Sequence, residues 1–177
     1  MLAPISSDVT MKIPVEAAIA DSHASPPKTF RPMTENDLDQ VHALECASQH
    51  SPWSLDHFRE ELANPCSQID LCWQGDRLAG FLCSWFIAGE LQVQNVATSP
   101  AFRRQGVAAR LLSMVLHRSL DAGLEAAWLE VRAGNTGAIA LYERFGFHEV
   151  ARRPGYYPDG EAALIMCFRP TDHKAGA

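Results

Sequence analysis

The sequence predicts an α/β protein in which a mixed sheet of about six to seven strands is flanked by about four helices. Three observations support this fold class. The second half of the chain alternates strand-like with helix-like segments, which is typical of parallel strand pairing. The first half contains two strand-like segments joined by Gln74-Gly75-Asp76, which indicates an antiparallel hairpin. A chain of 177 residues with 47% hydrophobic content can also fill the core of one domain.

The first half predicts a strand, two amphipathic helices and the hairpin. The expected elements are a strand at Thr29–Pro32, a helix after Thr34, a helix after Ser54, and strands at Ile69–Trp73 and Arg77–Ile87. Thr34 to Asp37 forms a capping-box-like start for the first helix. Helical spacing points four of its residues inward: Leu38, Val41, Leu44 and Cys46. Asn64-Pro65 ends the second helix.

The second half predicts four strands and two helices. The expected strands are Leu91–Thr98, Ala126–Arg132, Phe147–Arg152 and Ala162–Phe168. The expected helices are Gly106–Asp121 and Thr136–Phe145. Gly146 is suited to stop the last helix because glycine readily takes the left-handed conformation that follows many helices.

The ends of the chain differ from this patterned region. Residues 1–28 are rich in Ser, Pro and Ala and predict a flexible extension, residues 29–170 form the expected domain, and residues 171–177 form a tail. The extension could be a docking arm, but a disordered leader or a misassigned start codon explains it more simply. Lys12 is its only lysine or arginine before Lys28, and this scarcity and the scattered prolines argue against a secretory signal.

Charge and cysteine content exclude several classes of function. Fifteen Lys and Arg against 21 Asp and Glu give a net charge of −6, which disfavours nucleic-acid binding. No apolar run approaches the roughly 20 residues that cross a bilayer. The odd number of cysteines, without C-x-x-C spacing, favours reduced thiols in a cytoplasm and predicts no metal site. They are Cys46, Cys66, Cys72, Cys83 and Cys167.

The most informative stretch joins a strand to a helix. The strand that ends near Thr98 is followed by a loop with Arg103 and Arg104, and a helix begins after Gly106 with small residues. A helix start offers about four unpaired backbone N–H groups and the positive end of the helix dipole, so it can bind a diphosphate. An ordinary basic helix cap explains the same spacing, and the residues alone leave both interpretations open.

At this stretch the chain resembles the GNAT superfamily of N-acetyltransferases. Arg103 to Ala108 matches the superfamily's pyrophosphate loop, [QR]-x-x-G-x-[GA], and the resemblance continues through Leu129 to Asn135 and Ala138 to Phe147. More narrowly, Pro52-Trp53-Ser54 and Tyr156-Tyr157 resemble bacterial ribosomal-protein N-alpha-alanine acetyltransferases. The resemblance implies the GNAT fold, with a splayed parallel strand pair at the acetyl-CoA site.

The resemblance implies two catalytic residues. Strand alternation places Glu130 on the face opposite Leu129 and Val131, where we expect a partly desolvated carboxylate. It matches the superfamily's general base, although a strand ion pair with Arg132 or another arginine is the simpler interpretation of the residue alone. Tyr142 matches the residue that protonates the departing thiolate, although its helical spacing alone fits a core aromatic.

The resemblance also implies binding residues. Acetyl-CoA would contact Val96, Ala97, Thr98, Arg104, Gln105, Gly106, Val107, Ala108, Ala109 and Asn135. The backbone N–H of Val96 would meet the oxyanion, and Asn135 would contact the pantetheine arm or cap the following helix. The acceptor would meet aromatic walls at Trp53, Tyr156 and Tyr157. Glutamates that could attract a basic peptide are Glu60, Glu61 and Glu90.

The expected function is transfer of acetyl from acetyl-CoA to the N-terminal alanine of a small-subunit ribosomal protein, in the cytoplasm and without a metal. Two alternatives stay open. The acceptor could be a small-molecule amine or a lysine, or the chain could be a non-catalytic acetyl-CoA-binding regulatory module. We expect a monomer that contacts the N-terminal peptide of its substrate but neither nucleic acid nor membrane, although an exposed hairpin edge could pair with another chain.

Overall fold

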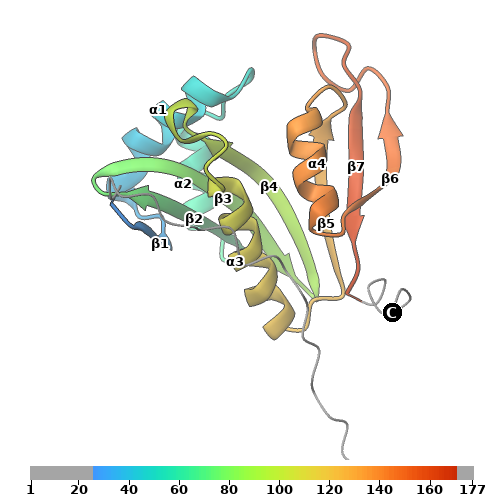
Figure 1. Cartoon of the computed structure of the whole chain (residues 1–177), viewed down its shortest axis with the longest axis horizontal. Coiled ribbons are helices and arrows are strands. Elements are labelled where there is room, and N and C mark those ends of the chain that lie inside the picture. Colours follow the sequence, from blue (N-terminus) through green and yellow to red (C-terminus); the bar gives the residue numbers. More distant parts are fainter. Residues whose placement is uncertain (1–25, 171–177) are drawn as a thin grey trace, which may run out of the picture.

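The computed structural model describes residues 26–170, which form one seven-stranded sheet with helices on both faces (Figure 1). The mixed α/β architecture predicted from the sequence is confirmed. The first strand begins at Lys28, one residue before the expected position. Apart from residues 26–28, the expected N-terminal extension and the expected tail at 171–177 lie outside the described residues.

Most elements lie within two residues of their expected positions. The strands are β1 (Lys28–Pro32), β2 (Ser67–Gln74), β3 (Arg77–Ile87), β4 (Glu90–Thr98), β5 (Ala126–Arg132), β6 (His148–Arg153) and β7 (Ala163–Phe168). The α-helices are α1 (Leu38–Ser48), α2 (Leu55–Ala63), α3 (Val107–Asp121) and α4 (Thr136–Arg144). Short 3₁₀ turns at Glu35–Asp37 and Pro100–Phe102 precede α1 and α3.

The sheet opens between its two parallel strands. The strand order is β1-β2-β3-β4-β5-β7-β6, and only the β4–β5 pair is parallel. That pairing runs from Glu90 beside Ala126 to Val93 beside Leu129 and then stops. Because the later residues of β4 and β5 do not pair with each other, the strands diverge toward their C-terminal ends (Figure 1). We call this gap the split.

A β-bulge in β4 accompanies the divergence. Cys83 of β3 lies opposite Asn95, whereas the next residue, Ser84, lies opposite Val93. Gln94 is therefore an extra residue in β4 at the level where pairing with β5 ends. Because a bulge bends its strand and increases the local twist, it turns the end of β4 away from β5.

Two apolar clusters hold helices on opposite faces of the sheet. One contains Leu82 of β3 and the apolar face of α3, including Leu111 and Val115. The other contains Phe81 and Cys83 of β3 together with residues of α1 and α2. Because successive residues of a strand point to opposite faces, one strand contributes to both clusters. These layers fix the β1–β4 part of the sheet on one side of the split.

Two expectations about surfaces are wrong. Cys46, expected to face inward from the first helix, is exposed. The edges of the predicted hairpin are not free, because β1 pairs with β2 and β4 pairs with β3. The edges of the sheet are instead β1 and β6.

The described residues contain neither a membrane-spanning helix nor a metal-binding cluster. No helix between residues 26 and 170 is long and apolar enough to cross a membrane. Within the same range, no three His, Cys, Asp or Glu side chains lie together in an arrangement that could hold a metal ion.

Candidate active site

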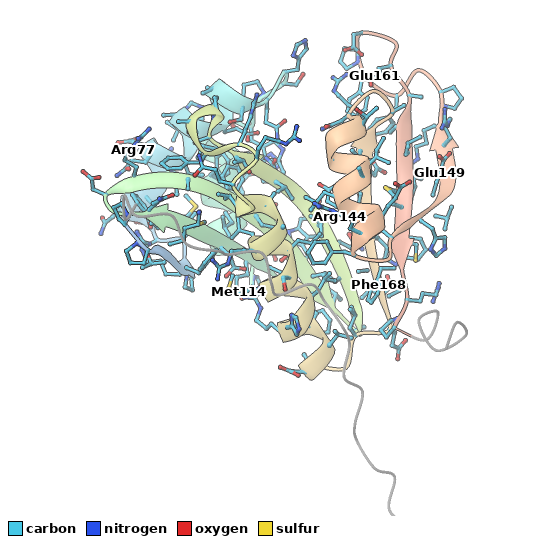
Figure 2. The ribbon with its side chains drawn as sticks, in the orientation of Figure 1. Arg77, Met114, Arg144, Glu149, Glu161 and Phe168 are labelled. Carbon is cyan, nitrogen blue, oxygen red and sulfur yellow. The ribbon has the colours of Figure 1, made fainter. Side chains whose placement is uncertain are left out.

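A cavity of about 370 Å³ lies at the split. Its lining combines the C-terminal end of α1, the turn between β5 and α4, and the loop between β6 and β7. The lining residues are Ser48, Gln49, His50, Arg132, Gly134, Asn135, Asp159 and Glu161. Glu161 lies at the open end of the β5–β7 part of the molecule (Figure 2). The cavity therefore connects the two sides of the split.

The backbone of β4 presents polar groups toward the split. Ser99 N–H donates to the carbonyl of Ala79 at 2.9 Å, which marks a hydrogen-bonded position of the β3–β4 pair. Bonded and non-bonded positions alternate in antiparallel pairs, so Ala97 opposite Phe81 is bonded to β3 and Val96 opposite Leu82 is not. The N–H and C=O of Val96 therefore face away from β3, toward the split.

Two hydrogen bonds from the end of α1 agree with this orientation. Gln49 Nε2 donates to the carbonyl of Val96 at 3.2 Å, and Ser48 Oγ donates to the carbonyl of Thr98 at 3.3 Å. Both carbonyls accept from outside the sheet, on the side where β5 has diverged. The N–H of Val96 shares this direction, because the N–H and C=O of one residue in an extended strand point to the same side.

The start of α3 has the features of an anion site. Gly106 precedes the helix at φ +75°, and no side chain caps the first turn. A Cβ atom added at Gly106 would meet nothing within 4 Å, so a ligand can approach the backbone closely. Arg103 and Arg104 are exposed in the loop before the helix. The unpaired N–H groups of this 15-residue helix, together with two guanidinium groups, can hold a diphosphate.

Glu130 lies on the exposed face of β5. Leu129 and Val131 are buried on the opposite face, as the alternation predicted, but the Glu130 side chain keeps 36% of its surface exposed. Its partner is Arg153 of β6, whose Nη1 lies 2.6 Å from Glu130 Oε1. A hydrogen bond to Glu130 raises the pKa of Tyr156, so this hydroxyl also faces the carboxylate.

Tyr142 is buried on α4. Its side chain belongs to the larger apolar cluster, with its ring centroid 6.0 Å from that of Phe147. Burial raises its pKa to about 12, with a smaller contribution from Tyr157. The hydroxyl therefore stays protonated at neutral pH and can donate a proton or a hydrogen bond.

Arg132 organises the β6–β7 loop. It donates to Glu161 Oε2 at 2.6 Å and to Asp159 Oδ2 at 2.8 Å, and its guanidinium lies 3.8 Å from the ring centroid of Tyr157. Glu161 Oε1 also accepts the N–H of Gly134 at 2.7 Å. The bond from Arg132 is the main reason that the pKa of Glu161 lies below its usual value. These contacts tie the loop to the turn between β5 and α4.

The structure brings only some of the expected acceptor residues together. Tyr156 and Tyr157 pack edge to face with centroids 5.1 Å apart, next to Glu130 and Arg132. Trp53 instead stacks on His57 at 4.1 Å and joins the cluster around α1 and α2. It is a half-buried anchor of the α1–α2 loop, on the other side of the split from the tyrosines.

Of the other polar residues expected at the site, most are accessible to a ligand and one is not. Asn135 caps α4, because its Oδ1 accepts the N–H of Ala138 at 3.2 Å, and it also lines the cavity. Glu60 and Glu90 are exposed, but Glu61 is buried and accepts a hydrogen bond from Trp85 Nε1 at 2.6 Å. Glu61 is therefore unavailable to a basic peptide.

Two residues at the site were missed by sequence reasoning. Arg153 was not assigned to Glu130, although two consecutive arginines just before the tyrosine pair were a visible signal. Gln49 gives no signal in the sequence, because one polar residue after a helix stands out only through its partners.

Comparisons with known proteins agree with the fold and identify the family. The sequence profile of the Acetyltransferase (GNAT) family matches residues 38–147. The [ribosomal protein bS18]-alanine N-acetyltransferase of Escherichia coli (strain K12) is 34% identical over 143 residues, which cover 79% of this chain and 96% of that protein. A putative enzyme of the same name from Bacillus subtilis (strain 168) is 34% identical over 138 residues, which cover 77% of this chain and 91% of that protein.

Solved structures give the same result. The crystal structure of the ribosomal-protein-S18-alanine N-acetyltransferase from Escherichia coli superposes with a TM-score of 0.77 at 32% identity, covering 81% of this chain and 94% of that one. Arabidopsis thaliana NAA60 in complex with acetyl-CoA shares the fold, with a TM-score of 0.72 at 17% identity over 81% of this chain and 98% of that one. This chain is therefore an acetyltransferase of the GNAT family.

Proposed function

We propose that the chain transfers the acetyl group of acetyl-CoA directly to the α-amino group of an N-terminal alanine, and that the acceptor is a small-subunit ribosomal protein. The relatives' names support the acceptor. The observation that carries the chemistry is the split, which exposes the Val96 N–H on its β4 side and borders β5, the strand of Glu130.

Acetyl-CoA fits the cofactor side of the split. The start of α3, with Gly106 and Arg104, would hold the diphosphate together with Gln105, Val107, Ala108 and Ala109. The end of β4, from Val96 to Thr98, and Asn135 on the opposite side would flank the pantetheine arm. The thioester carbonyl would then lie at the Val96 N–H, which donates a hydrogen bond to the developing oxyanion.

Glu130 would act as the general base. Its exposed carboxylate can take one proton from the incoming ammonium, directly or through a water molecule. Arg153 occupies the carboxylate in this structure, but an exposed ion pair contributes only about 0–1 kcal/mol, so an ammonium can displace it. The neutral amine would form the new C–N bond to the acetyl carbon, and its nitrogen would then lose a second proton to water as the amide forms.

Tyr142 would act as the general acid. When the C–S bond breaks, its hydroxyl donates a proton to the thiolate of coenzyme A, and water returns that proton before the next cycle. The high pKa of Tyr142 keeps this proton in place until the thiolate forms. Because the amine attacks the thioester directly, no cysteine has to act as a nucleophile.

A peptide α-amine fits this chemistry better than lysine does. With a pKa near 7.7–8.0, an α-ammonium loses its proton at pH 7 at a cost of about 1 kcal/mol, whereas a lysine costs several times more. The open cavity between two loops also suits the end of an extended chain.

The test is mass spectrometry of peptides incubated with the protein and acetyl-CoA. Three peptides are compared: one with a free N-terminal alanine followed by basic and aromatic residues, one with the same sequence and a blocked α-amine, and one blocked at the α-amine with an internal lysine. We expect a gain of about 42 Da, one acetyl group, on the first peptide alone. Acetylation of the lysine peptide alone, or of none while acetyl-CoA still binds, would contradict the proposal.

A further inference from the structure

A buried carboxylate at the end of α1 determines how a neighbouring amide is oriented. Glu45 is 1% exposed, and its Oε1 accepts the backbone N–H of Trp53 at 3.1 Å and Nδ2 of Asn95 at 3.0 Å. A backbone N–H can only donate, so Glu45 Oε1 must accept. Asn95 therefore turns its NH₂ group toward Glu45 and its carbonyl oxygen away from it.

The orientation of Asn95 in turn determines that of Gln49. Gln49 Nε2 lies 3.0 Å from Asn95 Oδ1 and 3.2 Å from the carbonyl oxygen of Val96. Both partners are acceptors, so each takes one of the two N–H groups of the Gln49 amide. Two independent acceptors thus require the same orientation, and the carbonyl oxygen of Gln49 must point the other way.

The Gln49 carbonyl oxygen is free to accept from a ligand. Gln49 is half-buried, lines the cavity at the split, and its Oε1 has no hydrogen-bond partner among residues 26–170. The amide also contacts the residue whose N–H is the proposed oxyanion donor. Its partner is the Val96 carbonyl, and the N–H of Val96 projects from β4 toward the same side.

The charge at this end of the cavity favours a cation. Gln49 is the C-cap of α1, and the last turn of that helix contains no basic side chain. The C-terminal end of a helix has a partial negative charge that attracts cations. Asp159 and Glu161 line the opposite wall, although both are paired with Arg132.

From this geometry we infer that Gln49 Oε1 is a hydrogen-bond acceptor for the α-ammonium group of the acceptor, and that Gln49 is a binding residue for the nitrogen that attacks the thioester. Glu45 and Asn95 are positioning residues, because they act only through the Gln49 amide. The inference rests on the proposed function and specifies how its acceptor is held. Glu130 takes a proton from the ammonium, and Gln49 holds it beside β4 without taking one.

The test measures how strongly the protein distinguishes a peptide with an α-amino group from one without it. The two probes are an alanine-initiated peptide and the same peptide beginning with a propionyl group, which lacks only that amino group. Binding of each is measured by calorimetry to the protein saturated with coenzyme A, so that no transfer occurs. The dissociation constant of the propionyl peptide divided by that of the alanine peptide reports the contacts made by the ammonium. This quotient is called the ratio below.

Two variants and one matched control separate this contact from general damage. Gln49→Met removes the whole amide, whereas Gln49→Lys keeps N–H donors for Asn95 and Val96 but has no acceptor. Ser48→Ala breaks the neighbouring bond from α1 to Thr98 and leaves the Gln49 carbonyl in place. We expect both Gln49 variants to lower the ratio by about tenfold, and Ser48→Ala to change both dissociation constants equally.

The outcomes also distinguish the inference from the proposed function. If the wild-type protein acetylates the alanine peptide but the ratio is the same in both Gln49 variants, the assignment of Gln49 is wrong. It is equally wrong if Ser48→Ala lowers the ratio as much, because the effect would then belong to the packing of α1 on β4. If the wild-type protein neither prefers nor acetylates the alanine peptide, the proposed function itself fails.

Discussion

Acidic residues behave differently on the two sides of the split. In the β1–β4 part of the molecule, four acidic side chains are buried: Asp37, Glu45, Glu61 and Asp70. In the β5–β7 part, four acidic side chains form ion pairs with arginines and keep 30–46% of their surface exposed: Glu130, Glu149, Asp159 and Glu161.

The comparison indicates that exposure, not residue type, separates the carboxylates that stabilise the fold from the one that we propose as the general base. Asp70 is bound by both terminal nitrogens of Arg118 at 3.1 and 2.8 Å and connects α3 to β2. Such a pair cannot reach a substrate without disrupting the core. Glu130 has a similar arginine partner, but both side chains face solvent and the pair can open. One side of the split therefore holds its acids in buried contacts, and the other holds them in exposed ion pairs that can open.

The largest effect is expected at Glu130. Glu130→Gln keeps the shape of the side chain and removes the proton acceptor, so kcat for the alanine peptide should fall by about 100-fold or more. Acetyl-CoA binding, measured by calorimetry, should stay unchanged, because the site at the start of α3 is intact. A variant that keeps the wild-type kcat would remove Glu130 from the mechanism.

The second effect is expected at Tyr142. Tyr142→Phe keeps the ring that packs on Phe147 but removes the proton donor, so kcat should fall by about tenfold to 100-fold. Thermal unfolding of the variant serves as the control and should match that of the wild type. If kcat is unchanged, Tyr142 is a core aromatic and nothing more.

The buried acids should affect stability instead. Asp37 accepts from Arg31 at 2.7 and 2.6 Å and from the N–H of Thr34 at 2.8 Å, which with the Arg31 bonds lowers its pKa to about 2. Asp37→Ala should reduce the free energy of unfolding at pH 7 by about 2 kcal/mol, with kcat unchanged.

The contribution of Asp37 to the free energy of unfolding should depend on pH. The folded pKa of Asp37 lies below its unfolded value of 3.8, so the stabilisation is complete above pH 4 and disappears as the pH falls toward 2. Urea unfolding of both proteins over this range measures it. A stability difference that stays constant down to pH 2 would contradict the assigned ion pair.

The contribution of Glu45 to stability should show the opposite dependence on pH. Burial raises its pKa, although the N–H of Trp53 and the amide of Asn95 partly counteract this. The folded state then holds the proton more tightly than the unfolded state, so stability decreases as the pH rises above the unfolded value of 4.5. Unfolding of Glu45→Gln should lack this decrease. If the unfolding free energies of the wild type and Glu45→Gln change in parallel with pH, Glu45 does not titrate in this way.

The smallest effect is expected at Glu149. This glutamate resembles Glu130 in exposure and in its arginine partner, since Arg152 Nε lies 3.1 Å from Glu149 Oε1. It lies on β6, an edge strand of the sheet, whereas Glu130 lies on β5 beside the split. Glu149→Gln should keep kcat within about twofold and leave thermal unfolding unchanged. A large loss of activity would mean that exposed ion pairs in this region act together.

Sequence patterns predicted the elements well, because their signals are local. Gly106 before α3 and the alternation of Leu129, Glu130 and Val131 in β5 each depend on neighbours in the chain. The order of the strands is less accessible, since the placement of β7 between β5 and β6 depends on long-range pairing.

The candidate site was only partly predictable for the same reason. Glu130 and Tyr142 were selected by resemblance, but the partner of Glu130 lies 23 residues away on β6 and could not be distinguished from Arg132 beforehand. Glu61 and Glu60 look alike in sequence, and only the folded structure buries Glu61 and gives it the hydrogen bond from Trp85. The orientation of Gln49 depends on a chain of contacts through Asn95 and Glu45.

The most direct test of the central claim is the ratio of the wild-type and Glu130→Gln rates for the alanine peptide, measured as kcat/KM from pH 7 to pH 9. At pH 7 only about a tenth of the α-amine is neutral, and at pH 9 about nine-tenths is. If Glu130 removes the proton of the ammonium, Glu130→Gln depends on the solvent to remove it, and the solvent does so for more of the peptide as the pH rises. The deficit of the variant in kcat/KM should therefore shrink by about tenfold between pH 7 and pH 9. A deficit that is the same at both pH values would contradict the assignment of Glu130 as the general base.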